Sequence, residues 1–166
     1  NKLSDKLEEN YVELEKVSIT DKLTQLNNRN RADAYFPKAL KQAVQDGNTL
    51  AAVILDIDKF KAINDNYGHL VGDEVLKKLA SILKQHIDSH SFLCRWGGEE
   101  FVIVISNASP ETIYEKVNAL RQFIANSHFE TVNQVTASFG VAIAQKDDSV
   151  NSLMERADRC LYQAKE

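Results

Sequence analysis

The amino-acid sequence predicts an α+β domain with a ferredoxin-like βαββαβ core, a mainly antiparallel central sheet and surrounding helices. Three observations support this fold class. Strand and helix patterns alternate in the required order, Leu50 to Leu55 is a continuous apolar run, and Gly97 and Gly98 separate two further apolar runs. Residues 1–18 are expected to form an N-terminal helix, which leaves 19–166 as the domain proper.

The composition is that of an ordinary globular domain. The chain has 166 residues, of which 43% are hydrophobic and 27% are charged. A net charge of −4 argues against a general nucleic-acid binder, which would carry a basic excess. The apolar runs are shorter than the roughly 20 residues that a membrane helix needs, so we expect no direct membrane contact from this segment.

The first 18 residues have a heptad-like spacing of apolar positions. Leu3, Leu7, Leu14 and Val17 fall on one seam, with Asn10 at a skipped position. Two interpretations remain open at this point: an amphipathic helix packed on its own domain, or the end of a coiled-coil stalk that arrives from an upstream part of a longer protein.

Periodicity predicts the other elements in chain order. The run at 50–56 reads as a strand buried on both faces, and 110–126 begins with a proline, which favours a helix start. The expected helices are 30–45, 59–66, 73–87, 110–126 and 150–165, and the expected strands are 50–56, 91–96, 101–105 and 134–144. Without the first helix this order is βαββαβ with a closing helix, an arrangement that places helices on one face of one sheet.

The hairpin is unusual because two carboxylates follow its glycines directly. Gly97 and Gly98 predict a tight turn and let a large ligand approach the backbone. Glu99 and Glu100 begin the second strand, where alternation should point them in opposite directions. A merely structural hairpin more often spreads its charges along the strands.

The topology brings the hairpin turn to the end of the first strand, which carries Asp56 and Asp58. Clustered carboxylates repel one another unless a cation or a shared proton lies between them, and a hard divalent ion is the simplest solution. Taken singly, each acid has a structural explanation: Asp56 as a strand-end residue or helix cap, Asp58 as a helix cap, Glu99 as a solvated turn charge, and Asp73 as the cap of the 73–87 helix. Together, Asp56 and Glu99 favour a metal site.

These residues belong to a longer set of motifs that resembles the GGDEF domains, the diguanylate cyclases. Gly97–Phe101 is the GGEEF form of the family's motif. Four further segments resemble the family in the same order, and the resemblance covers about residues 19 to 166: Asp21–Arg29, Asp56–Lys61, Asn64–Asp73 and Ala157–Lys165. The family fold is similar to the core of class III nucleotide cyclases and to the polymerase palm.

The resemblance implies condensation of two GTP molecules into cyclic di-GMP with release of two pyrophosphates. Asp56 and Glu99 would hold Mg²⁺ or Mn²⁺ with their side chains, and Ile57 with its backbone carbonyl. Glu99 is also the position proposed as proton acceptor, and Glu100 is catalytically important in the family. Lys61 would stabilise charge that develops at the phosphates.

Substrate-binding roles follow from the same resemblance. Asn64 and Asp73 would read guanine, whose N1–H and N2–H donors suit a carboxylate acceptor, and His69 would help to line that pocket. Lys165 matches a lysine that reaches the terminal phosphates. Gly97 and Gly98 would let the nucleotide approach the hairpin.

Family members work as homodimers in which each domain supplies half of the active site. The N-terminal helix would then pair protomers and connect them to an upstream sensory or regulatory domain. We expect a cytoplasmic domain, either free or as the cytoplasmic part of a membrane-anchored protein. One departure concerns the inhibitory product site, Arg-x-x-Asp, of many family members. Asp88 and Ser91 replace the Arg and the Asp, so no product-inhibition site is expected.

Three alternatives compete with the cyclase interpretation. The first is a catalytically silent GGDEF domain that acts as a GTP-binding or protein-interaction regulatory module. The second is a cyclase that makes a mononucleotide product, against which Asp73 and the GGEEF hairpin argue. The third is a pure dimerisation module, for which converging carboxylates would have no purpose.

Overall fold

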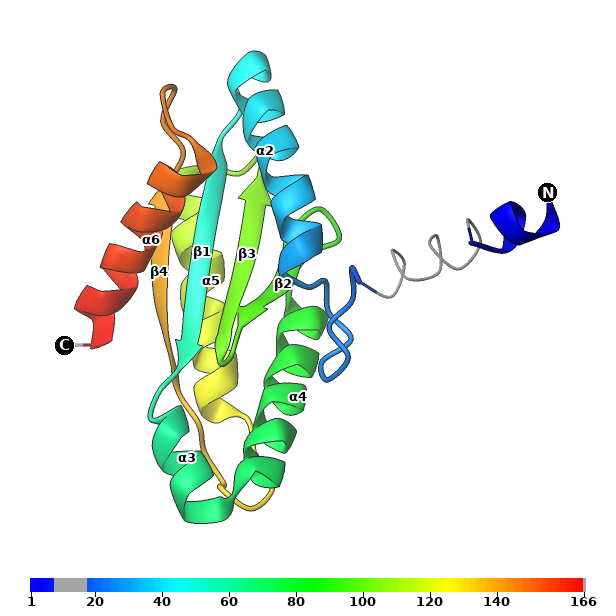
Figure 1. The fold of residues 1–166 in the computed structure, drawn as a ribbon. Helices are drawn as coiled ribbons and strands as arrows, with labels where there is room; N and C mark the ends of the chain where they lie inside the picture. Colours follow the sequence, from blue (N-terminus) through cyan, green and yellow to red (C-terminus); the bar gives the residue numbers. More distant parts are fainter. Residues whose placement is uncertain (8–17, 166) are drawn as a thin grey trace.

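The computed structural model describes residues 1–7 and 18–165, and Figure 1 shows the strands and helices in the predicted order. The elements of the domain are α2 (Arg29–Asp46), β1 (Leu50–Ile57), α3 (Phe60–Tyr67), α4 (His69–His86), β2 (Phe92–Gly97), β3 (Glu100–Ser106), α5 (Pro110–Asn126), β4 (Ala137–Ile143) and α6 (Val150–Lys165).

The four strands form one sheet in the order β2-β3-β1-β4, and every neighbouring pair is antiparallel. The predicted α+β class and antiparallel sheet are therefore confirmed. β1 lies between β3 and β4, so it is paired on both edges, as its continuous apolar run indicated. The register places Asp56, near the end of β1, directly opposite Glu100 at the start of β3.

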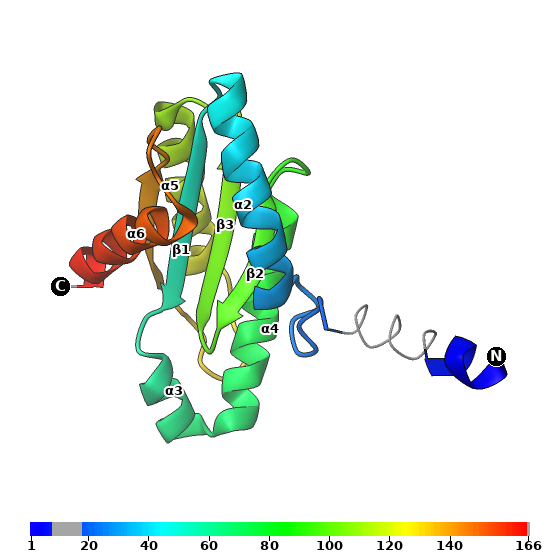
Figure 2. The same cartoon turned by 45° about the horizontal axis from the view of Figure 1, so that its top comes forward.

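Helices cover both faces of the sheet, whereas the βαββαβ pattern predicted cover on one face. Figure 2 shows α2 and α6 in front of the sheet and α5 behind it. The crossover helices α4 and α5 pack on one face, as expected. The helices that precede and follow the core, α2 and α6, carry apolar stripes of their own and cover the other face.

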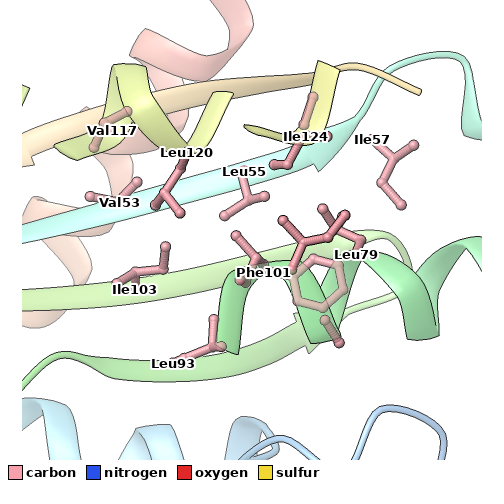
Figure 3. Close-up of a cluster of buried hydrophobic side chains, with 14 of the residues drawn as sticks. Val53, Leu55, Ile57, Leu79, Leu93, Phe101, Ile103, Val117, Leu120 and Ile124 are labelled. Carbon is pink, nitrogen blue, oxygen red and sulfur yellow. The ribbon is translucent and has the colours of Figure 1, made fainter. Parts of the chain in front are cut away.

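Alternation along β1 divides its side chains between the two cores. Val53, Leu55 and Ile57 point to the α4 and α5 side, and Leu50 and Ile54 point to the α2 and α6 side. Figure 3 shows the first core, in which the labelled side chains of β1 meet those of α4, β2, β3 and α5. Burial of each such aliphatic side chain contributes roughly 1.5–3 kcal/mol, so the central strands that lead to the site are firmly fixed.

The backbones of β4 and α6 approach each other closely at Gly140. A Cβ there would lie 2.0 Å from the carbonyl oxygen of Ala157 and 2.5 Å from the backbone nitrogen of Leu161. Both atoms belong to the backbone of α6, which cannot move aside locally. The absent side chain thus sets the position of α6 against the sheet.

One helix boundary differs from the prediction. α4 begins at His69, four residues before the predicted start at Asp73, and Gly68 is the residue between α3 and α4. Gly68 has φ 91° and ψ 164°, a conformation that suits glycine and turns the chain within one residue. Asp73 therefore lies inside the helix, and its interpretation as a cap was wrong.

The N-terminal prediction falls mostly outside the described residues. Residues 2–7 are helical, and Leu3 and Leu7 are 68% and 63% exposed. The other positions of the proposed seam lie in the stretch 8–17, which the structure does not describe. In the described part of the chain, no helix is long and apolar enough to cross a membrane.

Candidate functional site

Carboxylates from two strands meet at one end of the sheet, as the topology predicted. Asp56 faces the α6 side of β1, and Glu100 is its partner across the strands. Among residues 1–7 and 18–165, Oδ1 of Asp56 and Oδ1 of Asn64 are the buried side-chain oxygens that lack a hydrogen-bond partner. A buried acceptor without a donor costs about 1–3 kcal/mol, so both atoms point to a ligand that completes them.

The electrostatics of this end are those of an acidic cluster. Burial raises the pKa of Asp56 to about 6, Lys165 opposes the rise, and Glu99, Glu100 and Asp58 add to it. Burial also raises the pKa of Glu100, with smaller contributions from neighbouring carboxylates. The site therefore favours proton or cation uptake.

The prediction that strand alternation sets the directions of the two hairpin glutamates was wrong, because only Glu100 lies in a strand. The turn consists of Gly98 and Glu99, because Gly97 is the last residue of β2 and pairs with Glu100. Glu99 is thus a turn residue, and its charge, like that of Glu100, acts on Asp56. Gly98 has φ 46°, in the left-handed region, which explains a glycine there.

An arginine that the sequence analysis did not single out braces this turn. Nε and an Nη of Arg95 donate to the carbonyl oxygen of Gly98 at 3.1 and 2.8 Å. The other Nη lies 3.2 Å from both carboxylate oxygens of Asp21. Asp21 also accepts from the backbone N–H and hydroxyl of Thr24, at 2.9 and 2.7 Å. The segment before α2 thereby fixes the hairpin turn.

Asp58 connects three parts of the fold and does not cap α3. The N-cap of α3 is Lys59, so the capping interpretation was wrong. The hydroxyls of Thr136 and Ser138 each donate to the carboxylate of Asp58 at 2.7 Å, and Nζ of Lys165 donates at 3.0 Å. Burial acts to raise the pKa of Asp58, but these hydrogen bonds outweigh burial and lower it.

Lys165 also lies near Asp56, with Nζ 3.9 Å from Oδ2. This distance is too long for a hydrogen bond, so the ammonium group is bonded to Asp58 and only adjacent to Asp56. Figure 1 shows that the C-terminal end of α6 lies at the same end of the sheet as the end of β1. The structure thus places the predicted phosphate lysine beside the predicted metal carboxylate.

The predicted guanine residues lie on α3 and α4. Asn64 packs against Gly72, where a Cβ would lie 1.9 Å from Oδ1 of Asn64. Asp73 is the next residue of α4 and is partly buried, whereas His69, the first residue of α4, is exposed. Asn64 thus presents an unpartnered acceptor oxygen beside α4.

The donor set at the end of β1 fits a hard divalent cation. Asp56 offers an unpaired carboxylate oxygen, Glu99 a nearby carboxylate, and Ile57 a carbonyl group on a residue whose side chain is buried in the core. In the described ranges, no three His, Cys, Asp or Glu residues are grouped closely enough to hold a metal by themselves. Two carboxylates leave coordination positions for phosphate oxygens, which is the usual mode for Mg²⁺. Lys61 follows on α3 and is exposed.

Asp88 and Ser91, which stand at the positions of the family's Arg-x-x-Asp motif, are bonded to residues of the same chain. Nζ of Lys116 donates to Asp88 at 2.7 Å, and the Ser91 hydroxyl and the His90 backbone N–H donate to it at 3.0 Å. The hydrogen bond from Lys116 is the main reason that the pKa of Asp88 is lowered. Lys116 is therefore already paired with Asp88.

Comparisons with known proteins agree with this geometry. The family model described as diguanylate cyclase, GGDEF domain, matches residues 18–166. The response regulator PleD of Caulobacter vibrioides is 36% identical over 155 residues, 90% of this chain and 34% of that protein. A diguanylate cyclase of Vibrio cholerae is 38% identical over 155 residues, 92% of this chain and 48% of that protein. The chain thus spans about a third to a half of the length of these relatives.

Solved structures show the same fold. The coiled coil and GGDEF domain of DgcB from Caulobacter crescentus, in complex with c-di-GMP, superposes with a TM-score of 0.88 at 29% identity, covering 99% of this chain and 89% of that one. The active GGEEF domain of a diguanylate cyclase from Vibrio cholerae gives a TM-score of 0.80 at 38% identity, covering 85% of this chain and 92% of that one. By sequence, fold and site, the chain belongs to the GGDEF domain family of diguanylate cyclases.

Proposed function

We propose that this chain condenses two GTP molecules into cyclic di-GMP and releases two pyrophosphates. One observation supports this best. Asp56, which has a carboxylate oxygen without a hydrogen-bond partner, lies near the Glu99 and Glu100 carboxylates at the end of the sheet. A pure dimerisation module would have no use for these mutually repelling charges. Membership of the family, whose named relatives include diguanylate cyclases, agrees with the proposal.

Asp56, Glu99 and the Ile57 carbonyl would hold Mg²⁺ or Mn²⁺. When bound there, the ion would neutralise phosphate charge and make the 3′-hydroxyl easier to deprotonate. The 3′-oxygen of each GTP attacks the α-phosphorus of the other. In each attack the bond from the α-phosphorus to the α–β bridging oxygen breaks and one pyrophosphate leaves, so the second attack closes the ring. Glu99 is placed in the turn where a carboxylate could accept the hydroxyl proton.

Charge on the phosphates would be met by two lysines. Lys165 lies beside Asp56, and Lys61 is free to turn toward the phosphates because it is exposed on α3. The basis of guanine selection is proposed to be Asp73 and Asn64, whose oxygens accept the N1–H and N2–H protons. Adenine would leave these acceptors unpaired, which makes it a much poorer substrate.

Each domain would bind one GTP, so catalysis requires two domains that face each other as a homodimer. The segment 1–18, which the sequence predicts to be helical, is proposed to hold the protomers together and to transmit the state of an upstream domain. A stalk of this kind raises the effective concentration of one half-site for the other. Removal of residues 1–18 should then slow turnover most strongly at low protein concentration.

One assay tests the proposal against its alternatives. The protein is incubated at high concentration with GTP and Mg²⁺ or Mn²⁺, and the products are separated by chromatography. We expect cyclic di-GMP and pyrophosphate from the native chain and none from Glu99→Gln. A Glu115→Gln variant, which changes an exposed glutamate on α5, is the matched control and should be fully active. A mononucleotide product, or no product from the native chain, would contradict the proposal.

A further inference from the structure

Asp58 has no role in the proposed metal set, yet it is the most extensively bonded acid of the site. Its carboxylate accepts from Thr136, Ser138 and Lys165, at 2.7, 2.7 and 3.0 Å. Its backbone N–H donates to the carbonyl oxygen of Thr136 at 2.9 Å. The segment before β4, the start of β4 and the last turn of α6 therefore all meet at the end of β1.

We infer that Asp58 is a positioning residue that holds the Lys165 ammonium group beside the proposed phosphate site and keeps it from forming a direct hydrogen bond with Asp56. The two hydroxyl donors fix the carboxylate of Asp58, because each binds a different oxygen. The fixed carboxylate then accepts from Lys165, whose side chain extends from the end of α6 and is one-third exposed. This inference rests on the proposed function.

The position of the Lys165 ammonium group relative to Asp56 decides whether Asp56 stays available to a metal ion. Asp56 Oδ2 lies 3.9 Å from Nζ, so loss of the bond to Asp58 would leave Asp56 as the nearest carboxylate. A direct hydrogen-bonded ion pair there would place a cation on the carboxylate that a metal needs. Held by Asp58, the Lys165 ammonium group instead stays 3.9 Å from Oδ2 of Asp56 and can turn to a phosphate that approaches the proposed metal site.

Removal of the Asp58 carboxylate should therefore change the affinity for nucleotide in the opposite direction to the one expected from its charge alone. A carboxylate near the triphosphate repels it, so removal of that charge alone would tighten binding. If Asp58 acts by holding Lys165, its removal should weaken binding instead. The two explanations make opposite predictions for the same substitution.

The experiment is a double-mutant cycle with a nucleotide that cannot be cyclised. Affinity for α,β-methylene-GTP in the presence of Mg²⁺ is measured by calorimetry on the native chain, Asp58→Asn, Lys165→Met and the double variant. We expect each single change to weaken binding by about three- to tenfold, and the double variant to bind no more weakly than Lys165→Met. Equal weakening by Asp58→Asn in both backgrounds, or tighter binding in the native background, would overturn the inference.

Thr136 supplies a milder pair of variants that keep every charge. Thr136→Ser retains the hydroxyl and should bind as the native chain does, whereas Thr136→Val frees one oxygen of Asp58 and should weaken binding only when Lys165 is present. Equal affinities for the two variants would count against the inference. Failure of the native chain to bind the analogue would overturn the proposed function itself, so the two failures are distinguishable.

Discussion

Substitution by asparagine should change the stability of the metal-free protein in opposite directions at Asp56 and at Asp58. Burial raises the pKa of Asp56 from 3.8 to about 6, whereas hydrogen bonds outweigh burial at Asp58 and lower its pKa. The native state therefore binds the Asp56 proton more tightly than the unfolded chain does. Stability falls as pH rises from 3.8 to about 6, and the full cost of the ionised Asp56 is present above that range.

The magnitude follows from the difference between the two pKa values. A change from 3.8 to about 6 corresponds to at most about 3 kcal/mol, and solvent contact of the partly exposed carboxylate reduces this to about 1–3 kcal/mol. Asp56→Asn should therefore stabilise the metal-free protein at pH 7.5 while it abolishes cyclase activity. At pH 4.5 the gain should fall to about a third, because Asp56 is then mostly protonated in the native state.

Asp58→Asn is the matched control. The ionised carboxylate of Asp58 is favoured by folding, so its contribution is present above the unfolded value of 3.8 and is lost as pH falls through the lower native pKa. Its removal should destabilise the protein at pH 7.5. Urea unfolding with a chelator present, at pH 7.5 and 4.5, measures both variants. A less stable Asp56→Asn protein at pH 7.5, or an equal gain at the two pH values, would refute the reasoning.

Three further predictions concern close contacts and the degenerate product site. Gly140→Ala should lower the free energy of unfolding by about 1–3 kcal/mol, because the new Cβ meets the backbone of α6, and urea unfolding will show whether it does. Gly72→Ala should displace Asn64 and raise the KM for GTP, whereas a change confined to stability would contradict the placement of Asn64 in the site. Added cyclic di-GMP should cause no non-competitive inhibition, because Lys116 already pairs with Asp88; initial rates at fixed GTP measure this.

The features that depend on local pattern were predictable from the sequence. Apolar periodicity indicated the order of elements, and the continuous run at Leu50 to Leu55 indicated a central strand. Topology then brought Asp56 next to the hairpin, which the register with Glu100 confirms. The bounds of the hairpin strands were predicted to within one residue, whereas β4 begins at Ala137, three residues after the predicted start.

Contacts between distant segments could not be predicted in this way. Arg95 and Asp21 are 74 residues apart, and Asp58 and Ser138 are 80 apart, so no local pattern links them. The start of α4 was misplaced for a different reason. A glycine after a helix signals a break but not its length, and here Gly68 turns the chain within one residue.

The charge balance of the site agrees with the proposal that a cation is needed for nucleotide binding. Glu99, Glu100 and Asp58 each act on Asp56, and Lys165 is the ion-paired cation among these acids in the described part of the chain. A triphosphate that approaches this edge alone would meet net repulsion. A divalent ion on Asp56, as proposed, would reverse the sign of the local field and would coordinate the buried oxygen that lacks a hydrogen-bond partner. Asp56, whose ionised form we expect to destabilise the metal-free domain, would therefore also make nucleotide binding conditional on metal.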